Sequence, residues 1–372
     1  MIIKNSSTLI IMFFLTIYIS HAQNNRYKWG LQINSNIGKI IKHAAKFIVS
    51  PSEASYSVDM IWQRLPQGNK YWERIYKRST LGLLLSYHRF GDHDTYGSAI
   101  TLIPTWQRNI KYKNTWNLYC RMGSGLTYLS SPFHPYYNKE NVVIGSKINN
   151  CTSITLGANI KIEDKLDFTI QSGITHFSNG AIQLPNLGIN LIHSGAGIRY
   201  QFREKRKELI YDSLPPIAKR ISIQTRIGIG SNERSAIGGP KYPIYIYTIA
   251  IGKQWGQRRK LQLGCDYYYY PGIKSAIINN ENSVGNINLA SSKSALFIAH
   301  EYIVGQFGLL TQLGYYFYNP FLSVYPIYFK IGAQQYIPLN KNLRQNRLLA
   351  GIYLKTHFGD AELMAFAIGY EW

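Results

Sequence analysis

Apolar and polar side chains alternate along most of this chain, and after Ala22 no apolar run is long enough to cross a membrane as a helix, which needs about 20 residues. Alternation places successive side chains on opposite faces of an extended strand. In a membrane-spanning barrel one face meets lipid and the other meets the interior, so the pattern predicts an all-β fold, a transmembrane antiparallel β-barrel. Residues 116–128 illustrate it, with an apolar face made of Trp116, Leu118, Cys120, Met122, Leu126 and Tyr128.

The composition of the 372-residue chain agrees with a barrel. It contains 30 Tyr, 15 Phe and 7 Trp but only 16% charged residues, whereas soluble domains average about 25%. The net charge of +22 would suit nucleic acid, but the basic residues are scattered and an exported chain does not meet nucleic acid. Two interpretations of the charge stay open: a generally basic membrane-surface protein, or one whose Lys and Arg side chains partly lie near the phosphates of anionic lipids.

The alternating segments predict about sixteen strands, an even number that returns both chain ends to the periplasm. Most long connections then fall outside and most short ones inside, but 65–78 and the charged 204–219 break this rule. Two arrangements stay open: one barrel of about sixteen strands, or an 8-stranded barrel within 23–203, followed by a second β unit within 220–372. The expected strands are approximately 27–37, 55–64, 79–90, 97–110, 115–128, 150–162, 165–178, 187–203, 220–231, 242–255, 260–270, 294–304, 306–318, 324–337, 346–357 and 362–372.

Both ends of the chain predict export to the cell outer membrane. Lys4, an apolar run over 9–19 and the small residues of Ser20-His21-Ala22 form a signal peptide over 1–22, with cleavage before Gln23. At the other end an alternating strand finishes on an aromatic residue, which resembles the signal by which the barrel assembly machinery recognises outer-membrane barrels. Its apolar face consists of Met364, Phe366, Ile368, Tyr370 and Trp372.

One segment carries a possible catalytic pair. His176 and Ser178 are two residues apart, so both side chains leave the same face of a strand. An imidazole beside a hydroxyl is the minimum for a base-activated serine nucleophile. The shared face also carries Ile170 and Ile174, so it is the lipid-facing one, and the strand ends at the outer leaflet. We therefore expect a lipid substrate.

Further polar groups follow the pair. Asn190 lies on the apolar face of the next strand, where it could orient the imidazole. Asn179, Asn186 and the backbone amides near Gly180 and Ala181 are candidate donors to a developing oxyanion. The bland alternative is that Ser-Asn-Gly is a simple turn and that the histidine is an interfacial ring.

The segment resembles the outer-membrane lipid A 3-O-deacylases, also called acyloxyacyl hydrolases. His176-Phe-Ser178-Asn179 matches the first part of their motif, and Pro185-Asn186-Leu-Gly188-Ile189 the second; the stretch 141–149 is also similar. The resemblance implies a barrel with a lipid-facing Ser-His-acid triad that hydrolyses an ester-linked acyl chain of lipopolysaccharide. His176 would be the general base and Ser178 the nucleophile, and Asn186 with a nearby amide would form the oxyanion hole.

One position departs from the family. Its acidic third member aligns with Asn190, and an amide can hold the imidazole in one tautomer but cannot offset its positive charge. Activity could therefore be weakened. The alternatives to an esterase are a non-catalytic barrel, either a pore or a structural protein, and a soluble exported lipid-binding barrel.

No cofactor is expected. Cys120, Cys151 and Cys265 form neither a zinc pattern nor a disulfide framework, and no phosphate loop or dinucleotide fingerprint occurs. The expected partners are lipopolysaccharide with its lipid A, the surrounding outer-membrane lipids and the barrel assembly machinery.

Overall fold

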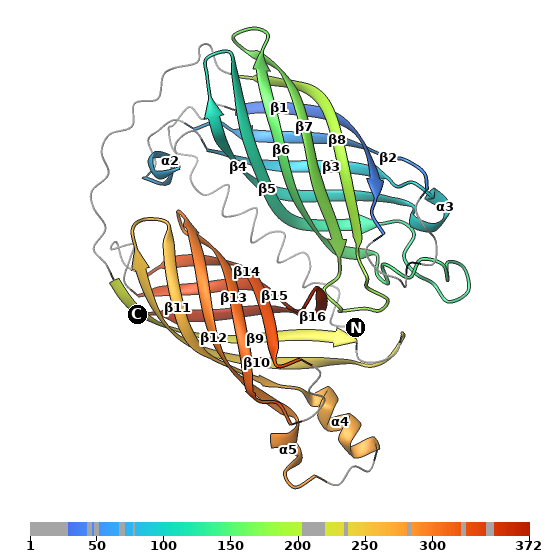
Figure 1. The fold of residues 1–372 in the computed structure, drawn as a ribbon, viewed down its shortest axis with the longest axis vertical. Coiled ribbons are helices and arrows are strands. Elements are labelled where there is room, and N and C mark those ends of the chain that lie inside the picture. The colour runs from blue at the N-terminus through green and yellow to red at the C-terminus, as the bar shows by residue number, and fades with distance from the viewer. Residues whose placement is uncertain are drawn as a thin grey trace.

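The strands of the protein close into two barrels that follow one another along the chain (Figure 1). The computed structural model describes residues 29–42, 47, 52–66, 71–76, 79–202, 220–233, 237–280, 284–320, 325–339 and 346–372. Within these ranges there are sixteen strands, as the alternation predicts, and they form two barrels rather than one larger barrel. The expected signal peptide (1–22) and charged connection (204–219) lie outside the described residues.

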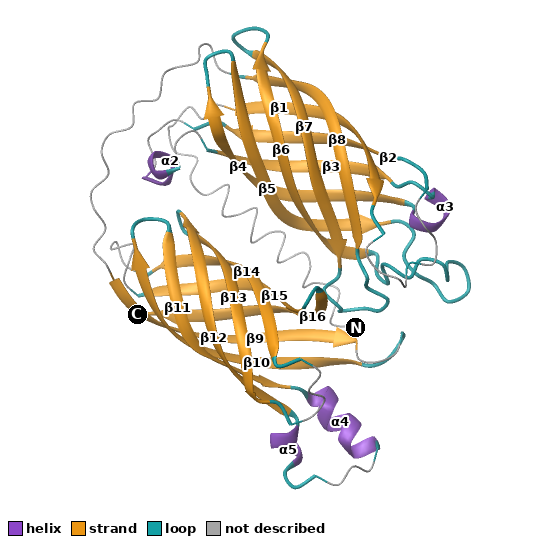
Figure 2. Ribbon diagram, viewed as in Figure 1, coloured by secondary structure: helices purple, strands orange, loops and turns teal. Residues whose placement is uncertain are grey.

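The first barrel has eight antiparallel strands, and β8 closes on β1. Short helices α2 (Tyr71–Ile75) and α3 (His93–Tyr96) lie in its connections (Figure 2). We call the end that carries the β5–β6 and β7–β8 connections the outer end. The strands are β1 (Trp29–Ile40), β2 (Ser55–Arg64), β3 (Thr80–Arg89), β4 (Ser98–Tyr112), β5 (Trp116–Leu129), β6 (Ile148–Lys161), β7 (Leu166–Ser178) and β8 (Ile189–Gln201).

The second barrel repeats this plan with the last eight strands. β16 closes on β9, and the amide of Trp372 donates to the carbonyl of Ile223 at 3.0 Å beyond the end of β16. Helices α4 (Pro271–Asn279) and α5 (Ile287–Ala290) lie between β11 and β12 (Figure 2), and we call the end of the second barrel that carries them its outer end. The strands are β9 (Arg220–Glu233), β10 (Lys241–Trp255), β11 (Arg259–Tyr269), β12 (Ser292–Val304), β13 (Phe307–Tyr318), β14 (Ile327–Pro338), β15 (Arg347–His357) and β16 (Asp360–Glu371).

Both barrels expose apolar side chains and bury polar ones, the reverse of a soluble protein. On β7, Ile170 and Ile174 are 44% and 50% exposed, whereas Thr169 and Gln171, which point inward, are buried. This arrangement suits lipid outside and a packed polar interior. Among the described residues no helix combines the length and the hydropathy that a membrane-spanning helix needs.

Hydrogen-bonded side chains fill the middle of the first barrel. The Arg121 guanidinium donates to the side-chain oxygens of Gln32 at 3.0 Å, Gln107 at 3.2 Å and Gln171 at 3.3 Å. These residues come from four different strands, so their contacts cross the interior. A barrel of eight strands is only wide enough for side chains to fill.

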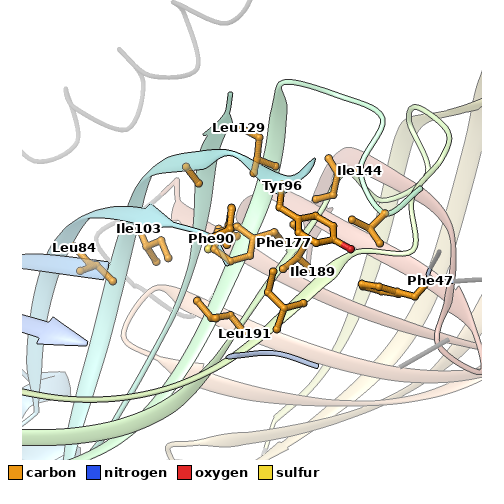
Figure 3. Packing of buried hydrophobic residues seen from close by; sticks show 14 of the residues in the cluster. Phe47, Leu84, Phe90, Tyr96, Ile103, Leu129, Ile144, Phe177, Ile189 and Leu191 are labelled. Carbon is orange, nitrogen blue, oxygen red and sulfur yellow. The ribbon is translucent and has the colours of Figure 1, made fainter. Parts of the chain in front are cut away.

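Apolar side chains close the outer end of the first barrel (Figure 3). Phe177 is fully buried there, and its ring meets that of Phe90 edge to face, with 5.3 Å between the ring centroids. Because side chains alternate along β7, burying Phe177 turns its two neighbours, His176 and Ser178, to the outer wall. This cluster of apolar side chains, which we call the apolar cap, therefore sets the direction of both the His176 and the Ser178 side chain. The labelled members are Phe47, Leu84, Phe90, Tyr96, Ile103, Leu129, Ile144, Phe177, Ile189 and Leu191.

The interior of the second barrel centres on the buried carboxylate of Asp266. It forms an ion pair with Lys330, whose Nζ lies 2.5 Å away. Four neutral donors add hydrogen bonds to the same carboxylate, which satisfies its lone pairs. They are Thr248 at 2.5 Å, Tyr268 at 2.9 Å, Gln312 at 2.7 Å and Tyr328 at 2.7 Å.

We predict that Asp266→Ala destabilises the second barrel. The substitution leaves the Lys330 ammonium buried without its counter-ion, and breaking a buried pair in this way costs about 3–5 kcal/mol. Urea unfolding in detergent, followed by heat-modifiable gel mobility, measures the loss. Asp360→Ala at the exposed start of β16 is the control and should unfold as the wild type does. Equal midpoints for the two variants would contradict the role of Asp266.

Candidate active site

The ends of β7 and β8 bring the three expected catalytic residues together. His176 lies directly opposite Asn190 in the register of the two strands, and Ser178 is the last residue of β7. All three lie on the outer wall at the outer end of the barrel. Ser178 is 7% exposed, while His176 and Asn190 are partly exposed.

The imidazole of His176 is held by the side chain of Asn190. Its Nδ1 lies 2.6 Å from Asn190 Oδ1. An amide oxygen only accepts hydrogen bonds, so Nδ1 carries the proton and the lone pair of the neutral ring is on Nε2. A ring in this tautomer can act as a general base through Nε2.

Gly188 lets the backbone pass next to the imidazole. A Cβ at this position would lie 2.7 Å from Cε1 of His176 and 3.4 Å from its Nε2. Gly188 also has φ +82°, a left-handed conformation that other residues rarely adopt. The glycine of the Pro185–Ile189 motif is therefore required both by its backbone conformation and by the space that the histidine occupies.

Two N–H donors converge on the hydroxyl of Ser178. Its Oγ accepts from the backbone amide of Gly180 at 3.2 Å and from Asn186 Nδ2 at 3.0 Å. Asn186 Oδ1 is also within hydrogen-bond distance of Oγ, at 3.2 Å. Donors beside an attacking oxygen are suitably placed for an oxyanion that forms on the carbon it attacks.

Asn179 braces the loop that carries these donors. Its Nδ2 donates to Ser146 Oγ at 2.9 Å and to the carbonyl of Gln183 at 2.8 Å. Its backbone amide donates to Asn186 Oδ1 at 3.0 Å, which orients the Asn186 side chain. Asn179 thus holds Asn186 toward Ser178, whereas the sequence alone suggested it as a direct oxyanion donor.

Gly180 and Ala181 form the turn that follows Ser178. Both have left-handed backbones, with φ +65° and +66°. The turn directs the Gly180 amide back toward Ser178. The amide of Ala181, the other backbone donor suggested by the sequence, has no hydrogen bond to Ser178 among those that the structure shows.

The stretch 141–149 supports the loop from its other side. The amide of Gly188 donates to the carbonyl of Val143 at 2.9 Å, and Gln183 Nε2 donates to the carbonyl of Gly145 at 2.6 Å. From the sequence we noted only that this stretch resembles the family, and we assigned it no role. Backbone carbonyls make these contacts, so residue types give little sign of them.

No metal cluster accompanies this site within the ranges that the structure describes. There, no three His, Cys, Asp or Glu side chains gather as ligands. The three cysteines are free thiols.

Comparison with protein families identifies the chain. A model described as lipid A 3-O-deacylase (PagL) matches residues 53–204, and one described as acyloxyacyl hydrolase, C-terminal domain, matches residues 220–372. Residues 53–204 thus belong to the lipid A 3-O-deacylase family, and residues 220–372 to the acyloxyacyl hydrolase C-terminal domain. The gap between the two matches falls between the two barrels, since β8 ends at Gln201 and β9 begins at Arg220.

Solved structures of outer-membrane proteins are also similar. The outer membrane enzyme PagL is 15% identical, with a TM-score of 0.34, and the alignment covers 45% of this chain and 98% of that one. A BenF-like porin from Pseudomonas fluorescens is 10% identical, with a TM-score of 0.22, and covers 93% of this chain and 97% of that one. No curated protein matches the sequence.

We predict that Gly188→Ala disables the site without unfolding the barrel. The added Cβ displaces the imidazole, and a misplacement of about 1 Å can cost roughly 100-fold in rate. Labelling of Ser178 by a fluorophosphonate measures the loss. Gly238→Ala is a matched control, because Gly238 has φ +79° but no atom of the described residues lies within 4 Å of the added Cβ. Equal labelling of the two variants would contradict the proposed clash.

Proposed function

We propose that this protein is an outer-membrane serine esterase that hydrolyses an ester-linked acyl chain of lipid A. The observation that carries the proposal is the convergence of Gly180 N and Asn186 Nδ2 on Ser178 Oγ. It is combined with a histidine whose tautomer Asn190 sets. Membership of the lipid A 3-O-deacylase family supports the choice of substrate.

The reaction would proceed in two half-reactions. The Ser178 hydroxyl turns from Asn186 Oδ1 toward His176 Nε2 and gives up its proton, while Oγ attacks the ester carbonyl. Gly180 N–H and Asn186 Nδ2 donate to the resulting oxyanion. When the carbon–oxygen bond of the ester breaks, the protonated imidazole gives its proton to the departing sugar oxygen, which leaves as a hydroxyl group.

Water then releases the acyl chain from Ser178. His176 Nε2 takes a proton from the water, the hydroxide attacks the acyl-serine carbonyl, and Oγ leaves and regains the proton. The products are a free fatty acid and a sugar hydroxyl. Neither half-reaction requires a metal or an organic cofactor.

The position of the site suits a substrate that stays in the membrane. The outer face of β7 below the catalytic pair is apolar, and Ile170 and Ile174 are exposed along it. An acyl chain could lie against this strip while its ester bond reaches Ser178. Export through the signal peptide 1–22 and insertion by the barrel assembly machinery would place the outer end in the leaflet that contains lipopolysaccharide.

The filled interiors favour this function over a pore. The Arg121 contacts cross the first barrel, and the contacts of Asp266 join four strands of the second. A conducting pore needs an open channel, which barrels of eight strands do not leave.

We predict that Ser178→Ala abolishes fatty-acid release from lipopolysaccharide while both barrels remain folded. Loss of the nucleophile in a comparable triad lowers kcat by about 10⁶-fold. Mass spectrometry of lipid A and of the released acids measures the change. Ser172→Ala, four residues before His176 on the same outward face of β7, is the control and should keep wild-type activity. Equal release by Ser178→Ala and wild type, with ion conductance in planar bilayers, would instead support the pore.

We predict that Asn190→Asp raises kcat and that Asn190→Ala lowers it. A carboxylate keeps the hydrogen bond to Nδ1 and adds attraction to the imidazolium formed in the reaction. Hydrogen bonds to charged groups are worth about 1.5–3 kcal/mol, compared with roughly 1 kcal/mol for neutral ones, which suggests about a tenfold gain. Steady-state rates of deacylation test this, and no gain in Asn190→Asp would show that Asn190 is not the partner that limits the rate.

A further inference from the structure

The loop that follows the nucleophile contacts the second barrel. The backbone amide of Glu233, at the end of β9, donates to the carbonyl of Ala181 at 3.0 Å. The Glu233 carboxylate accepts from the backbone amide of Leu184. Glu233 is 6% exposed, so these bonds are shielded from water. One residue of the second barrel thus binds the loop at two points.

Apolar side chains of the second barrel lie behind the same turn. A Cβ on Gly180 would lie 3.0 Å from Cβ of Met364 and 3.4 Å from Cδ1 of Leu354. These residues belong to β16 and β15, and Figure 1 shows the end of β7 next to β16. The turn that carries the Gly180 donor is therefore packed between the two barrels.

The barrels also meet at their inner ends. The Arg258 guanidinium, between β10 and β11, donates to the carbonyl of Ile75 at 2.5 Å and lies over the Tyr76 ring, 5.1 Å from its centroid. The ring of Tyr76 is 5.6 Å from that of Tyr302. Outer end touches outer end and inner end touches inner end, so the two barrels have the same direction and could lie side by side in one membrane.

The geometry of the turn explains why an outside support matters. Ala181 has φ +66°, which costs energy for a residue with a Cβ. The two bonds to Glu233 hold the chain at this strained position and just after it, at the Ala181 carbonyl and the Leu184 amide. Without them the turn can relax and carry the Gly180 amide away from Ser178.

We propose that the second barrel is part of the active site, in which Glu233 is a positioning residue that holds the oxyanion turn of the first barrel. This inference rests on the proposed esterase function. Glu233 contacts the loop and not the reacting atoms, so it acts through the Gly180 amide. A structural barrel that only anchored the enzyme would not need a buried carboxylate at this place.

The test compares Glu233→Ala with Glu233→Gln in the full chain. Alanine leaves the Leu184 amide without an acceptor, whereas glutamine keeps a side-chain carbonyl there. We expect kcat for lipid A deacylation to fall about 10- to 100-fold in Glu233→Ala, with KM changed less than about threefold. Glu233→Gln should recover most of the wild-type kcat. Fluorophosphonate labelling of Ser178 should slow in parallel.

Lys241→Ala is the matched control. Lys241 also reaches the loop from the second barrel, but among the described residues its Nζ donates to the side chain of Gln183 alone, at 3.2 Å and in an exposed place. Its loss should leave kcat unchanged. If Glu233→Ala fails to fold, as judged by heat-modifiable mobility, Glu233→Leu keeps the side-chain bulk without an acceptor and should give the same fall in kcat.

The outcomes separate the two proposals. If Ser178→Ala is inactive but Glu233→Ala and Glu233→Leu keep the wild-type kcat, the positioning role is wrong and the esterase stands. A rise in KM with an unchanged kcat in Glu233→Ala would also overturn the positioning role. If Ser178→Ala remains active, the esterase itself is wrong.

Discussion

Every backbone N–H and C=O group that faces lipid must find its partner within the protein, because hydrocarbon offers none. The structure meets this requirement twice, by pairing β8 with β1 and β16 with β9. Each barrel is closed, so neither exposes a strand edge. The rigid walls that result allow polar catalytic groups to stand at a membrane surface, because the strands that carry them cannot shift without breaking a closed ladder.

The site uses this wall through simple alternation. Phe177 is buried in the apolar cap, so its neighbours His176 and Ser178 emerge on the outside. The register of β7 and β8 then brings Asn190 to the imidazole. Strands place the proposed base and nucleophile, and a braced loop places the proposed oxyanion donors. A displacement of this loop would therefore weaken the stabilisation of the oxyanion, while the proposed base and nucleophile would stay in place.

Much of this could be predicted from the sequence because side-chain alternation is a local property. The expected strand 165–178 corresponds to Leu166–Ser178, and the parity of His176, Ser178 and Asn190 predicted their shared face. Which strand closes on which depends on pairing between distant segments, so the sequence left one barrel and two barrels open. The hydrogen bonds of Asn179 and of Glu233 lie in loops or between barrels and do not depend on side-chain alternation, so only the three-dimensional structure shows them.

The amide of Asn190 has a consequence for how acidity controls the enzyme. A triad with a carboxylate stops working when either its acid or its histidine gains a proton. A side-chain amide is not protonated in ordinary water, so acid does not break the Nδ1–Oδ1 hydrogen bond by protonating Asn190. The activity of a Ser-His-Asn site would therefore be lost in acid through one protonation, that of the imidazole. Such a site would be slower than a triad with a carboxylate, but its rate would depend on pH in a simpler way.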